Sequence, residues 1–456
     1  MRAKVQMHLG IDDTDSPKRG CTTYICAVIT EELLKRGVQF TDYPNLIRLN
    51  PNAPWKTRGN GAICIRIQIE KREIENIKEI VIKNVEKLSD LTHEDTNPGI
   101  AFLIGQVPRN LRNFAKKVIR STTTLNQAKK IAKRVGAELY TLKEGRGIVG
   151  ALAAIGETLN EDHTYELIAY RKPENWGTPR KIDEVSVYEM DKLTSPLTFN
   201  NIDYETGRIL ITPRGPDPVL YGIRGETPEI LRQAQKIVKT YEPIERWIIY
   251  RTNQGTDAHL RKVEKISQIK IYDAIILRGR VTTRPKNLPG GHVIIEISDG
   301  ENTIDCAVYE PTGALTKIAR HLIPGDLIEV YGGAKITVKQ KMTINVEKLA
   351  ILKLAPLIEL KNPKCPKCGK TMKSLGKNKG YKCPKCKYKA HLPKQAKIKP
   401  RQILEGIYLP PPRAHRHLTK PLTRLGKEKT KTPQKLSEPW YWSISFKPPN
   451  KNNTDE

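Results

Sequence analysis

The sequence lacks any long apolar run. No stretch approaches the roughly 18 consecutive apolar residues of a membrane-spanning helix, and the N-terminus has no apolar signal-peptide segment. No Gly-Lys-Ser/Thr triplet follows the glycine-rich stretch Gly145–Gly156, which excludes a Walker-type phosphate loop there. No internal repeat is evident either. We therefore expect a cytoplasmic protein without a membrane partner.

Acidic residues are scarce toward the C-terminus. Residues 361–456 contain 25 Lys and Arg against 5 Asp and Glu, so this last fifth holds about two-thirds of the net charge of +30. Such an excess suits a polyanion, either a nucleic acid or a membrane surface. Because no spanning segment is present, a nucleic-acid partner is the better expectation.

Cysteine is used sparingly, and half of it is concentrated in one motif. Cys365 and Cys368, and then Cys383 and Cys386, form two C-x-x-C pairs separated by 14 residues. Two such pairs can hold one tetrahedral Zn²⁺, and a four-thiolate site of this kind is closed and structural. A redox disulfide is the weaker alternative, since neither pair has a thioredoxin-like setting. The other four cysteines lie in apolar runs and are typical of buried thiols in a reducing compartment.

A chain of 456 residues is too long for one core, so three or four domains are expected. Residues 1–165 and 166–268 alternate strand and helix patterns. The clearest expected strands are Val5–Ile11, Gly61–Glu70, Tyr165–Tyr170 and Trp247–Arg251, and the clearest helices are Thr22–Arg36, Ile74–Leu88, Ala115–Val135 and Glu229–Lys239.

Residues 269–356 change to short alternating strands. The expected strands are Ile275–Thr283, Val293–Ser298, Thr303–Tyr309, Leu327–Ile336 and Thr343–Leu352, with one helical segment, Gly313–His321, between the third and fourth. Five strands with a helix at that position are typical of an OB-fold that binds single-stranded nucleic acid, and another small structural barrel is the alternative.

The C-terminal regions are basic. The cysteine pairs predict a zinc ribbon over residues 361–392. Residues 393–456 form a basic, proline-rich tail that we expect to be partly extended or disordered. Its aromatic residues Trp440, Tyr441, Trp442 and Phe446 could stack on unpaired bases or dock into a groove of the same protein.

Three carboxylates stand close together near the start of the chain. Asp12, Asp13 and Asp15 follow the first expected strand, in a polar turn. Carboxylates this close repel each other, and a cation such as Mg²⁺ between them relieves the repulsion. A solvated turn or a helix N-cap is the alternative interpretation.

Three further loops of the first block suit phosphates or small polar ligands. Lys56–Gly61 is basic and contains glycine, so Lys56 and Arg58 can donate charge-assisted hydrogen bonds, although Asn-Gly also makes ordinary hairpin turns. The other two loops contribute Asn97, Gly99, Gly145, Arg146, Gly147 and Gly150. The second of these resembles a phosphate-binding helix N-terminus, while close helix–sheet packing would also require its small residues.

The second block has glycine-rich loops with charged residues that do not suit a plain connection. Asp217, in Gly215–Val219, and Glu226, in Tyr221–Glu226, could receive a cationic ligand. A rigid Gly-Pro loop with surface ion pairs is the alternative.

Several motifs together resemble the archaeal tRNA-isoleucine agmatidine synthetase family. The similarity runs in order from residue 1 to about 390 and includes the OB-fold and ribbon segments. The motifs that carry it are Gly10–Ser16, Cys21–Tyr24, Lys56–Gly61, Gly215–Val219, Tyr221–Glu226 and Thr252–Asp257.

The resemblance implies a multidomain α+β enzyme with a kinase-like α/β domain, a ferredoxin-like domain, an OB-fold barrel and a C-terminal zinc ribbon. It implies an ATP-dependent ligase that joins agmatine to C2 of the wobble cytidine in the CAU anticodon of tRNA-isoleucine, releasing AMP and phosphate, so that the tRNA reads AUA. It also implies that the enzyme phosphorylates its own Thr22.

On this basis Asp12, Asp13 and Asp15 would hold Mg²⁺, and Lys56 and Arg58 would position the phosphates of ATP together with the loop at Gly145–Gly150. Asp217 would bind the guanidinium of agmatine. Two alternatives remain: an OB-fold and zinc-ribbon protein that only binds single-stranded nucleic acid, and a kinase that acts on another RNA.

Overall fold

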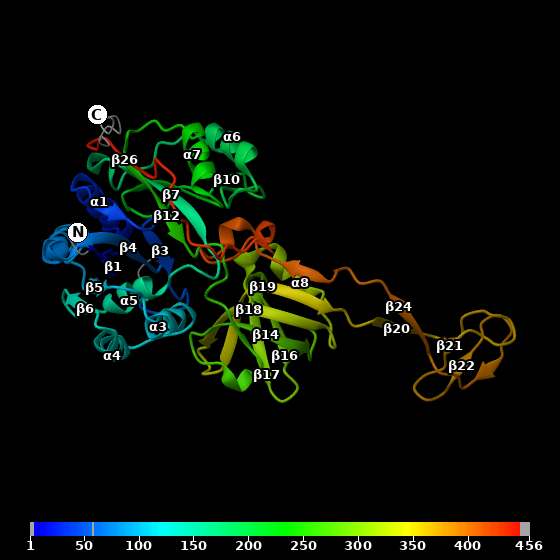
Figure 1. Ribbon diagram of the computed structural model, residues 1–456. Helices are drawn as coiled ribbons and strands as arrows, with labels where there is room; N and C mark the ends of the chain where they lie inside the picture. The colour runs from blue at the N-terminus through cyan, green and yellow to red at the C-terminus, as the bar shows by residue number, and fades with distance from the viewer. Residues whose placement is uncertain (1–3, 57–58, 447–456) are drawn as a thin grey trace.

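The computed structural model describes residues 4–56 and 59–446. Figure 1 shows a large α/β body, a barrel beside it, and a small ribbon carried on a two-stranded arm. The predicted multidomain α+β class is confirmed. None of the helices in the described ranges is long and apolar enough to cross a membrane.

A single 11-stranded sheet runs through the α/β body. Its first half has the order β6-β5-β1-β4-β3, with β2 beside β4, and all these neighbours are antiparallel. The strands are β1 (Lys4–Asp12), β2 (Gln39–Phe40), β3 (Asn45–Arg48), β4 (Gly61–Glu70), β5 (Gly99–Ile104) and β6 (Glu138–Thr141).

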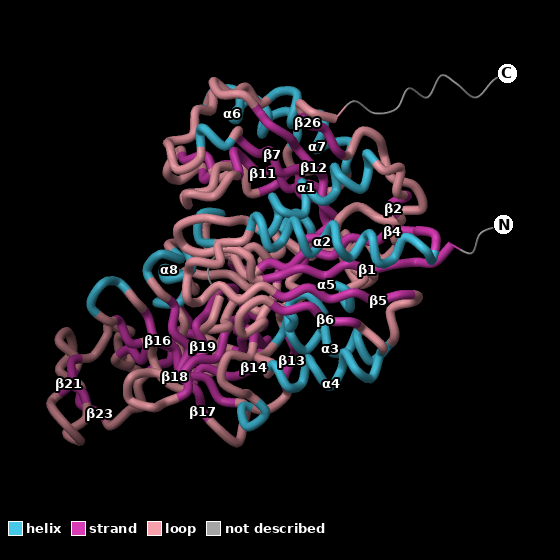
Figure 2. Tube along the Cα trace, turned by 90° about the vertical axis from the view of Figure 1, so that its left-hand side faces the viewer, coloured by secondary structure: helices cyan, strands magenta, loops and turns pink. Residues whose placement is uncertain are grey.

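Helices cover both faces of this half, because its central strands are apolar on both sides. In β4, Ile63 and Ile65 belong to the core under α1 and α2, while Ala62 and Cys64 belong to the core under α3, α4 and α5. Figure 2 shows these two helical layers on opposite sides of the sheet. The helices are α1 (Thr22–Lys35), α2 (Ile74–Leu88), α3 (Arg109–Arg120), α4 (Leu125–Val135) and α5 (Ile148–Gly156).

The single helix expected over Ala115–Val135 is wrong: the segment belongs to two helices, α3 and α4. Residues 121–124 separate them, and the Thr124 side chain accepts a hydrogen bond from the backbone of Gln127 in a capping box. The apolar spacing suggests one continuous helix, but the capping hydrogen bonds of Thr124 stabilise a new helix start there instead.

The second half of the sheet continues in the order β12-β7-β11-β8, joined to the first by parallel pairing of β3 with β12. Helices α6 and α7 pack against each other and α7 packs on this half of the sheet. The elements of this region are β7 (Thr164–Arg171), α6 (Glu184–Thr194), β8 (Thr198–Phe199), β11 (Val219–Gly225), α7 (Pro228–Ile237) and β12 (Ile244–Thr252), while β9 (Ile202–Asp203) and β10 (Arg208–Ile209) form a separate two-stranded sheet.

The barrel closes through the pairs β14–β18, β18–β19, β19–β17, β17–β16 and β16–β14. The order of the barrel elements along the chain, with α8 between the third and fourth barrel strands, confirms the predicted OB-fold. The elements are β13 (Arg261–Val263), β14 (Ala274–Val281), β15 (Lys286–Asn287), β16 (Val293–Ser298), β17 (Thr303–Val308), α8 (Ala314–Arg320), β18 (Leu327–Ile336) and β19 (Met342–Lys353).

An arm of two antiparallel strands, β20 (Leu357–Lys361) and β24 (Gln395–Lys399), leads to the ribbon. The ribbon has three short strands, β21 (Lys373–Ser374), β22 (Tyr381–Lys382) and β23 (Lys389–Ala390). The ribbon thus stands away from the body, as Figure 1 shows.

Of the two expectations for the tail, partly extended or disordered, disorder is wrong for residues 393–446: they include the extended strand β24 and then return to pack on the protein. β25 (Gly406–Tyr408) pairs with β19 of the barrel, and β26 (Tyr441–Ser443) pairs with β12 of the body. Trp440 is 2% exposed and packs against Phe40 and Tyr43, so docking on the chain itself is the role of this aromatic cluster. The proline-rich composition gave no sign that side chains of this C-terminal segment (residues 400–446) are buried against the body.

Replacing Trp440 tests how firmly this segment is anchored. We expect Trp440→Ala to lower the stability of the α/β body by about 3–5 kcal/mol, since it removes a large buried side chain. Trp442→Ala is the matched control, because Trp442 lies only two residues further along, within β26, but is 41% exposed. Urea unfolding followed by circular dichroism measures both; equal midpoints for the two variants would contradict the anchoring role.

Candidate active site

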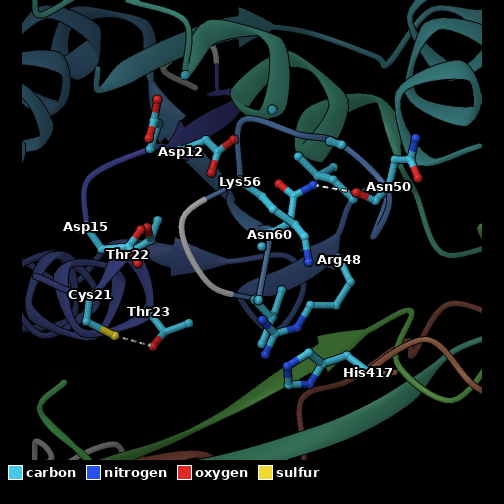
Figure 3. A pocket seen from close by; sticks show the side chains of 18 of the residues that line it. Asp12, Asp15, Cys21, Thr22, Thr23, Arg48, Asn50, Lys56, Asn60 and His417 are labelled. Atoms are coloured by element: carbon cyan, nitrogen blue, oxygen red, sulfur yellow. Dashed lines mark hydrogen bonds between the residues drawn. The ribbon is translucent and has the colours of Figure 1, made fainter. Parts of the chain in front are cut away.

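A cavity of about 440 Å³ lies where the two halves of the sheet meet. Asp12 reaches it from the end of β1, Arg48 from β3, Glu166 from β7 and Arg224 from β11, and His417 from the C-terminal segment completes its lining. Figure 3 shows aspartates on one side and Arg48 with His417 on the other. The cavity therefore has an acidic side and a cationic side.

Asp12, Asp13 and Asp15 all line the acidic side. Burial, followed by the charge of Asp13, raises the pKa of Asp12 well above its usual value. Burial likewise raises the pKa of Asp13 to about 6, although Arg146 lies 3.8 Å from its carboxylate. Crowded, partly buried carboxylates of this kind favour a bound cation.

The three aspartates do not converge on one point. In the part of the chain that the structure describes, only the four cysteines bring three or more ligand atoms within 4.8 Å of one another. This spread still suits Mg²⁺, which proteins hold through one or two carboxylates together with substrate phosphates.

The glycine-rich stretch packs directly against Asp12. A Cβ on Gly150 would lie 1.8 Å from the Asp12 carboxylate, and a Cβ on Gly147 would lie 2.6 Å from its carbonyl oxygen. Arg146, Gly147 and Gly150 line the cavity beside the N-terminus of α5. Close helix–sheet packing and a place in the cavity wall therefore both explain these small residues.

Asn97, Gly99 and Gly145 do not line this cavity. They shape the loop behind it: the Asn97 carbonyl accepts a hydrogen bond from the Gly147 amide at 3.0 Å, and its side-chain oxygen accepts one from the Glu144 amide at 3.3 Å. A Cβ on Gly99 would lie 2.0 Å from the Ile148 nitrogen. These residues hold the loop in place rather than contact a ligand in the cavity.

Thr22 lies at the start of α1 and lines the acidic side of the cavity. Its hydroxyl is 2.9 Å from that of Thr14, within the aspartate turn. Cys21 and Thr23 line the cavity as well, and their side chains contact each other at 3.1 Å. The hydroxyl of Thr22 is thus held beside the three carboxylates.

The cationic side contains Arg48, Lys56 and Arg224. Glu166 connects two of them, at 3.8 Å from Arg48 and 3.2 Å from Arg224, and it also accepts a hydrogen bond from Gln254. Burial lowers the pKa of Lys56, and the charges of neighbouring cations lower it further. Arg58, which the sequence also places in this loop, lies outside the described residues.

The sequence reasoning missed Arg48, Glu166 and His417. Arg48 ends an apolar strand and Glu166 lies within another, where a single charged residue gives no distinctive motif. Arg224 was present in the motif Tyr221–Glu226 but was not singled out. His417 belongs to the basic tail, so only the return of the C-terminal segment to the cavity reveals it.

The structure separates Asp217 from Glu226. Asp217 lines the cavity, where its carboxylate lies 3.4 Å from Arg180 and accepts a hydrogen bond from the Val219 amide at 3.1 Å. Glu226 does not line it: its carboxylate accepts hydrogen bonds from Arg424 and Lys429 of the C-terminal segment, both at 2.6 Å. Glu226 thus serves to anchor that segment.

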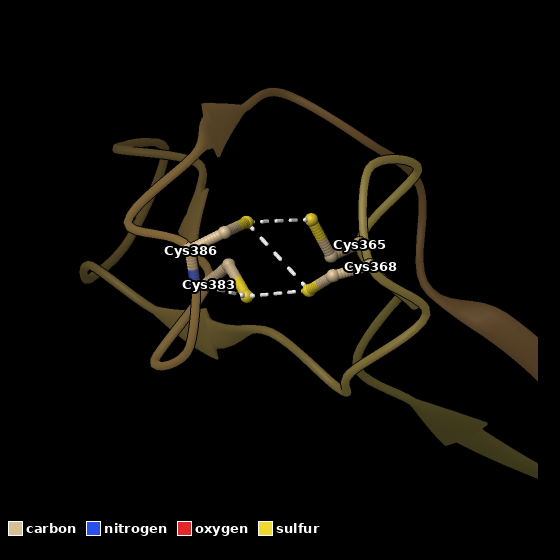
Figure 4. Close-up of side chains that lie close together, drawn as sticks. All are labelled: Cys365, Cys368, Cys383 and Cys386. Atoms are coloured by element: carbon tan, nitrogen blue, oxygen red, sulfur yellow. Dashed lines mark hydrogen bonds between the residues drawn. The ribbon is translucent and has the colours of Figure 1, made fainter.

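The four ribbon cysteines face one point (Figure 4). Their sulfur atoms lie within 4.8 Å of one another, with Cys365 and Cys386 at 3.5 Å and Cys368 and Cys383 at 3.4 Å. Four sulfurs at about 2.3 Å from a tetrahedral Zn²⁺ would be about 3.8 Å apart, so this set fits the ion closely. Cys26, Cys64 and Cys306 are buried and Cys21 is half-buried, and all four are free thiols.

Four family models match the chain in order. They are the TiaS TCKD domain over residues 8–78, the TiaS FLD domain over residues 145–259, an OB-fold nucleic acid binding domain over residues 275–352, and the TiaS C-terminal zinc ribbon domain over residues 362–403.

Full-length relatives agree with these models. The tRNA-isoleucine 2-agmatinylcytidine synthetases TiaS of Pyrococcus horikoshii and Methanocaldococcus jannaschii are each 47% identical to the chain, over 91% and 92% of its length and 96% and 98% of theirs. A crystal structure of TiaS with its isoleucine tRNA and ATP superposes with a TM-score of 0.83 at 39% identity, over 92% of this chain and 97% of that one.

A second crystal structure, of TiaS with the same tRNA, AMPCPP and agmatine, has a TM-score of 0.81 at 37% identity and covers 92% of this chain and 98% of that one. Domain models, relatives and solved structures therefore agree, and the chain belongs to the tRNA-isoleucine 2-agmatinylcytidine synthetase (TiaS) family.

Proposed function

We propose that this protein is an ATP-dependent ligase that joins agmatine to C2 of the wobble cytidine in the CAU anticodon of tRNA-isoleucine, so that the tRNA decodes AUA. AMP and phosphate are the released products. The observation that carries the proposal is the cavity between the two halves of the sheet, with carboxylates on one side and three cations on the other. Its TiaS relatives carry the name of this reaction, and solved TiaS complexes contain ATP, an isoleucine tRNA and agmatine.

ATP would lie between the two sides of the cavity. Asp12, Asp13 and Asp15 would hold Mg²⁺, which neutralises phosphate charge in transfer reactions. Lys56, with Arg58 of the same loop, and Arg146 would donate to phosphate oxygens. Transfer of the γ-phosphoryl group to the C2 oxygen of cytidine leaves ADP and turns that oxygen into a leaving group. The agmatine amine then displaces it as phosphate, and hydrolysis of the remaining ADP gives AMP and a second phosphate. Fixed charges around the phosphates are the main requirement for such transfers.

Agmatine presents a guanidinium group, for which a carboxylate is the natural partner. Asp217 lies in the cavity wall and is 8% exposed. Its carboxylate accepts hydrogen bonds from Arg180 and from the Val219 amide, which hold it in the cavity wall. We assign Asp217 to the guanidinium and Glu226 to the anchoring of the C-terminal segment.

The tRNA would be held by the barrel and the ribbon, and its wobble base would leave the stack to reach the cavity. Within this proposal residues 1–165 form the kinase-like ATP-binding domain and residues 166–268 the ferredoxin-like domain. Residues 269–356 and 361–392 form the OB-fold and the zinc ribbon, and residues 393–456 form the basic tail. Because its partner is tRNA, we place the protein in the cytoplasm.

Thr22 is proposed to receive phosphate from the same ATP. Its hydroxyl lies in the wall that contains the three aspartates, so a nucleotide bound there would place its terminal phosphate within reach.

Omitting each substrate in turn tests the proposed function. Incubation with ATP, agmatine and the CAU-anticodon tRNA-isoleucine should produce AMP, and leaving out either agmatine or the tRNA should prevent product formation. Production of ADP alone would instead support a kinase that acts on another RNA. Tight binding of single strands without any nucleotide consumption would support a simple binding protein.

Asp12→Asn tests the acidic side of the cavity. The variant keeps the shape of the side chain beside Gly150 but loses its charge, so we expect turnover to fall by about 100-fold or more, with tRNA affinity within about twofold of wild type. The same variant should incorporate no labelled phosphate at Thr22 from γ-labelled ATP. Glu79→Gln, an exposed carboxylate on α2, is the matched control. Loss of tRNA binding in Asp12→Asn would count against a purely catalytic role.

Cys368→Ser tests the ribbon. We expect the purified variant to lose its zinc, measured by elemental analysis, and to bind tRNA-isoleucine less tightly, because the ribbon is rich in lysine and needs the metal to fold. His391→Ala, an exposed ribbon residue outside the sulfur cluster, should keep its zinc. Unchanged tRNA affinity in a zinc-free variant would refute a recognition role for the ribbon.

A further inference from the structure

The C-terminal segment places a histidine among the cations of the cavity. Residues 400–446 run from the barrel back to the body, and His417 is the only histidine in the described part of the cavity lining. Figure 3 shows its ring beside Arg48. Gly255 donates its backbone amide to the His417 carbonyl at 2.9 Å, and Asp257 does the same to the next carbonyl, Leu418, at 2.8 Å. The backbone around the imidazole is therefore fixed to the body.

Buried ion pairs hold the segment just beyond His417. Arg424 is 1% exposed and contacts Asp162 at 3.0 Å and Glu226 at 2.6 Å. Lys420 contacts the same Asp162 at 3.0 Å, and both partners of that pair are 8% exposed. Buried ion pairs in which each charge has several hydrogen-bond partners hold the chain in one position. The position of His417 is thus set by the body and not by a loose tail.

One nitrogen of the imidazole is already engaged. Nδ1 lies 2.9 Å from a terminal nitrogen of Arg224 and 3.1 Å from the side-chain oxygen of Gln254. A guanidinium can only donate, so the shorter, charge-assisted contact with Arg224 calls for an unprotonated Nδ1, and the Gln254 oxygen, which can only accept, is then a neighbour of Nδ1 and not its hydrogen-bond partner. The neutral ring then has its proton on Nε2.

The surrounding charges favour that neutral state. The charge of Arg48, burial, and the charges of Arg224 and Lys56 together lower the pKa of His417 well below its usual value. Glu166 is the carboxylate that pairs with these arginines, and its oxygens are engaged by Arg48, Arg224 and Gln254. A fourth positive charge would therefore be unfavourable here, whereas an uncharged donor is tolerated.

Nε2 lies close to Gly59 in the loop that follows Lys56. A Cβ on Gly59, which also lines the cavity, would lie 3.1 Å from Nε2 and 2.6 Å from a terminal nitrogen of Arg48. No residue within 4–56 or 59–446 is bonded to this nitrogen. Glycine at position 59 therefore lets the loop pass close to both donors, where a side chain would clash with them.

We propose that the C-terminal segment completes a phosphate-binding subsite, in which the Nε2–H of His417 donates to a phosphate oxygen that Arg48 and Arg224 also contact. Three cations attract the anion, and the neutral imidazole adds a directional hydrogen bond without a further charge. The phosphate ester comes either from ATP or from the backbone of the tRNA. This assignment rests on the proposed function. It makes His417 a binding residue that the C-terminal segment contributes to a cavity otherwise formed by the α/β body.

His417→Ala and His417→Gln test the subsite in the full-length enzyme. Dissociation constants are measured separately for AMPCPP with Mg²⁺ and for tRNA-isoleucine. We expect His417→Ala to weaken one of the two by about fivefold to tenfold, the loss typical of one hydrogen bond, and His417→Gln to restore part of it through its amide donor. A loss confined to AMPCPP assigns the subsite to ATP, and a loss confined to tRNA assigns it to the tRNA backbone.

His415→Ala is the matched control, because His415 is in the same segment but contacts the Pro410 carbonyl and does not line the cavity. Wild-type affinity of His417→Ala for both ligands would overturn the inference, as would a ¹⁵N spectrum showing a protonated Nδ1 at neutral pH. If wild-type enzyme forms no agmatine adduct, the proposed function fails independently of these results.

Discussion

The structure depends on the seam between β3 and β12, where the two halves of the sheet become one. Arg251 of β12 pairs in register with Asn45, and its guanidinium meets Asp42 at 2.5 Å. Both charged side chains are almost fully buried, at 1% and 3% exposure, so removing either would leave the other without its partner. Next to this pair, the Asn253 side chain accepts a hydrogen bond from the Arg48 amide at 2.8 Å and donates one to the Arg48 carbonyl at 2.9 Å. The seam thus fixes the residue that begins the cationic side of the cavity.

This constraint explains why one cavity can serve three substrates. The aspartate turn belongs to the first half of the sheet, Asp217 and Arg224 belong to the second, and His417 arrives from the C-terminal segment. The three aspartates and the three cations lie on opposite sides of the cavity, and each side also holds one residue of opposite charge, Arg146 beside Asp13 and Glu166 between Arg48 and Arg224. On the proposed assignments, a metal-bound triphosphate, the guanidinium of agmatine and a nucleotide of the tRNA would meet between these preorganised charges.

Sequence alone predicted much of the fold because its signals are local. The alternation in Gly61–Glu70, the spacing in Ile74–Leu88 and the paired cysteines each depend on neighbouring residues, and the structure contains β4, α2 and the sulfur cluster at those positions. Asp12 was visible as part of a dense cluster. Arg48 and His417 were not, since each is an ordinary charged or polar residue whose role arises only from long-range pairing.

The central claim is that the cavity joins agmatine to the wobble cytidine at the expense of ATP. The most direct measurement is mass analysis of the anticodon fragment of tRNA-isoleucine after incubation with the enzyme, ATP and isotope-labelled agmatine. The account predicts one labelled agmatine on the wobble nucleotide for each tRNA and each AMP formed. An unmodified wobble cytidine, or label at any other nucleotide, would contradict it.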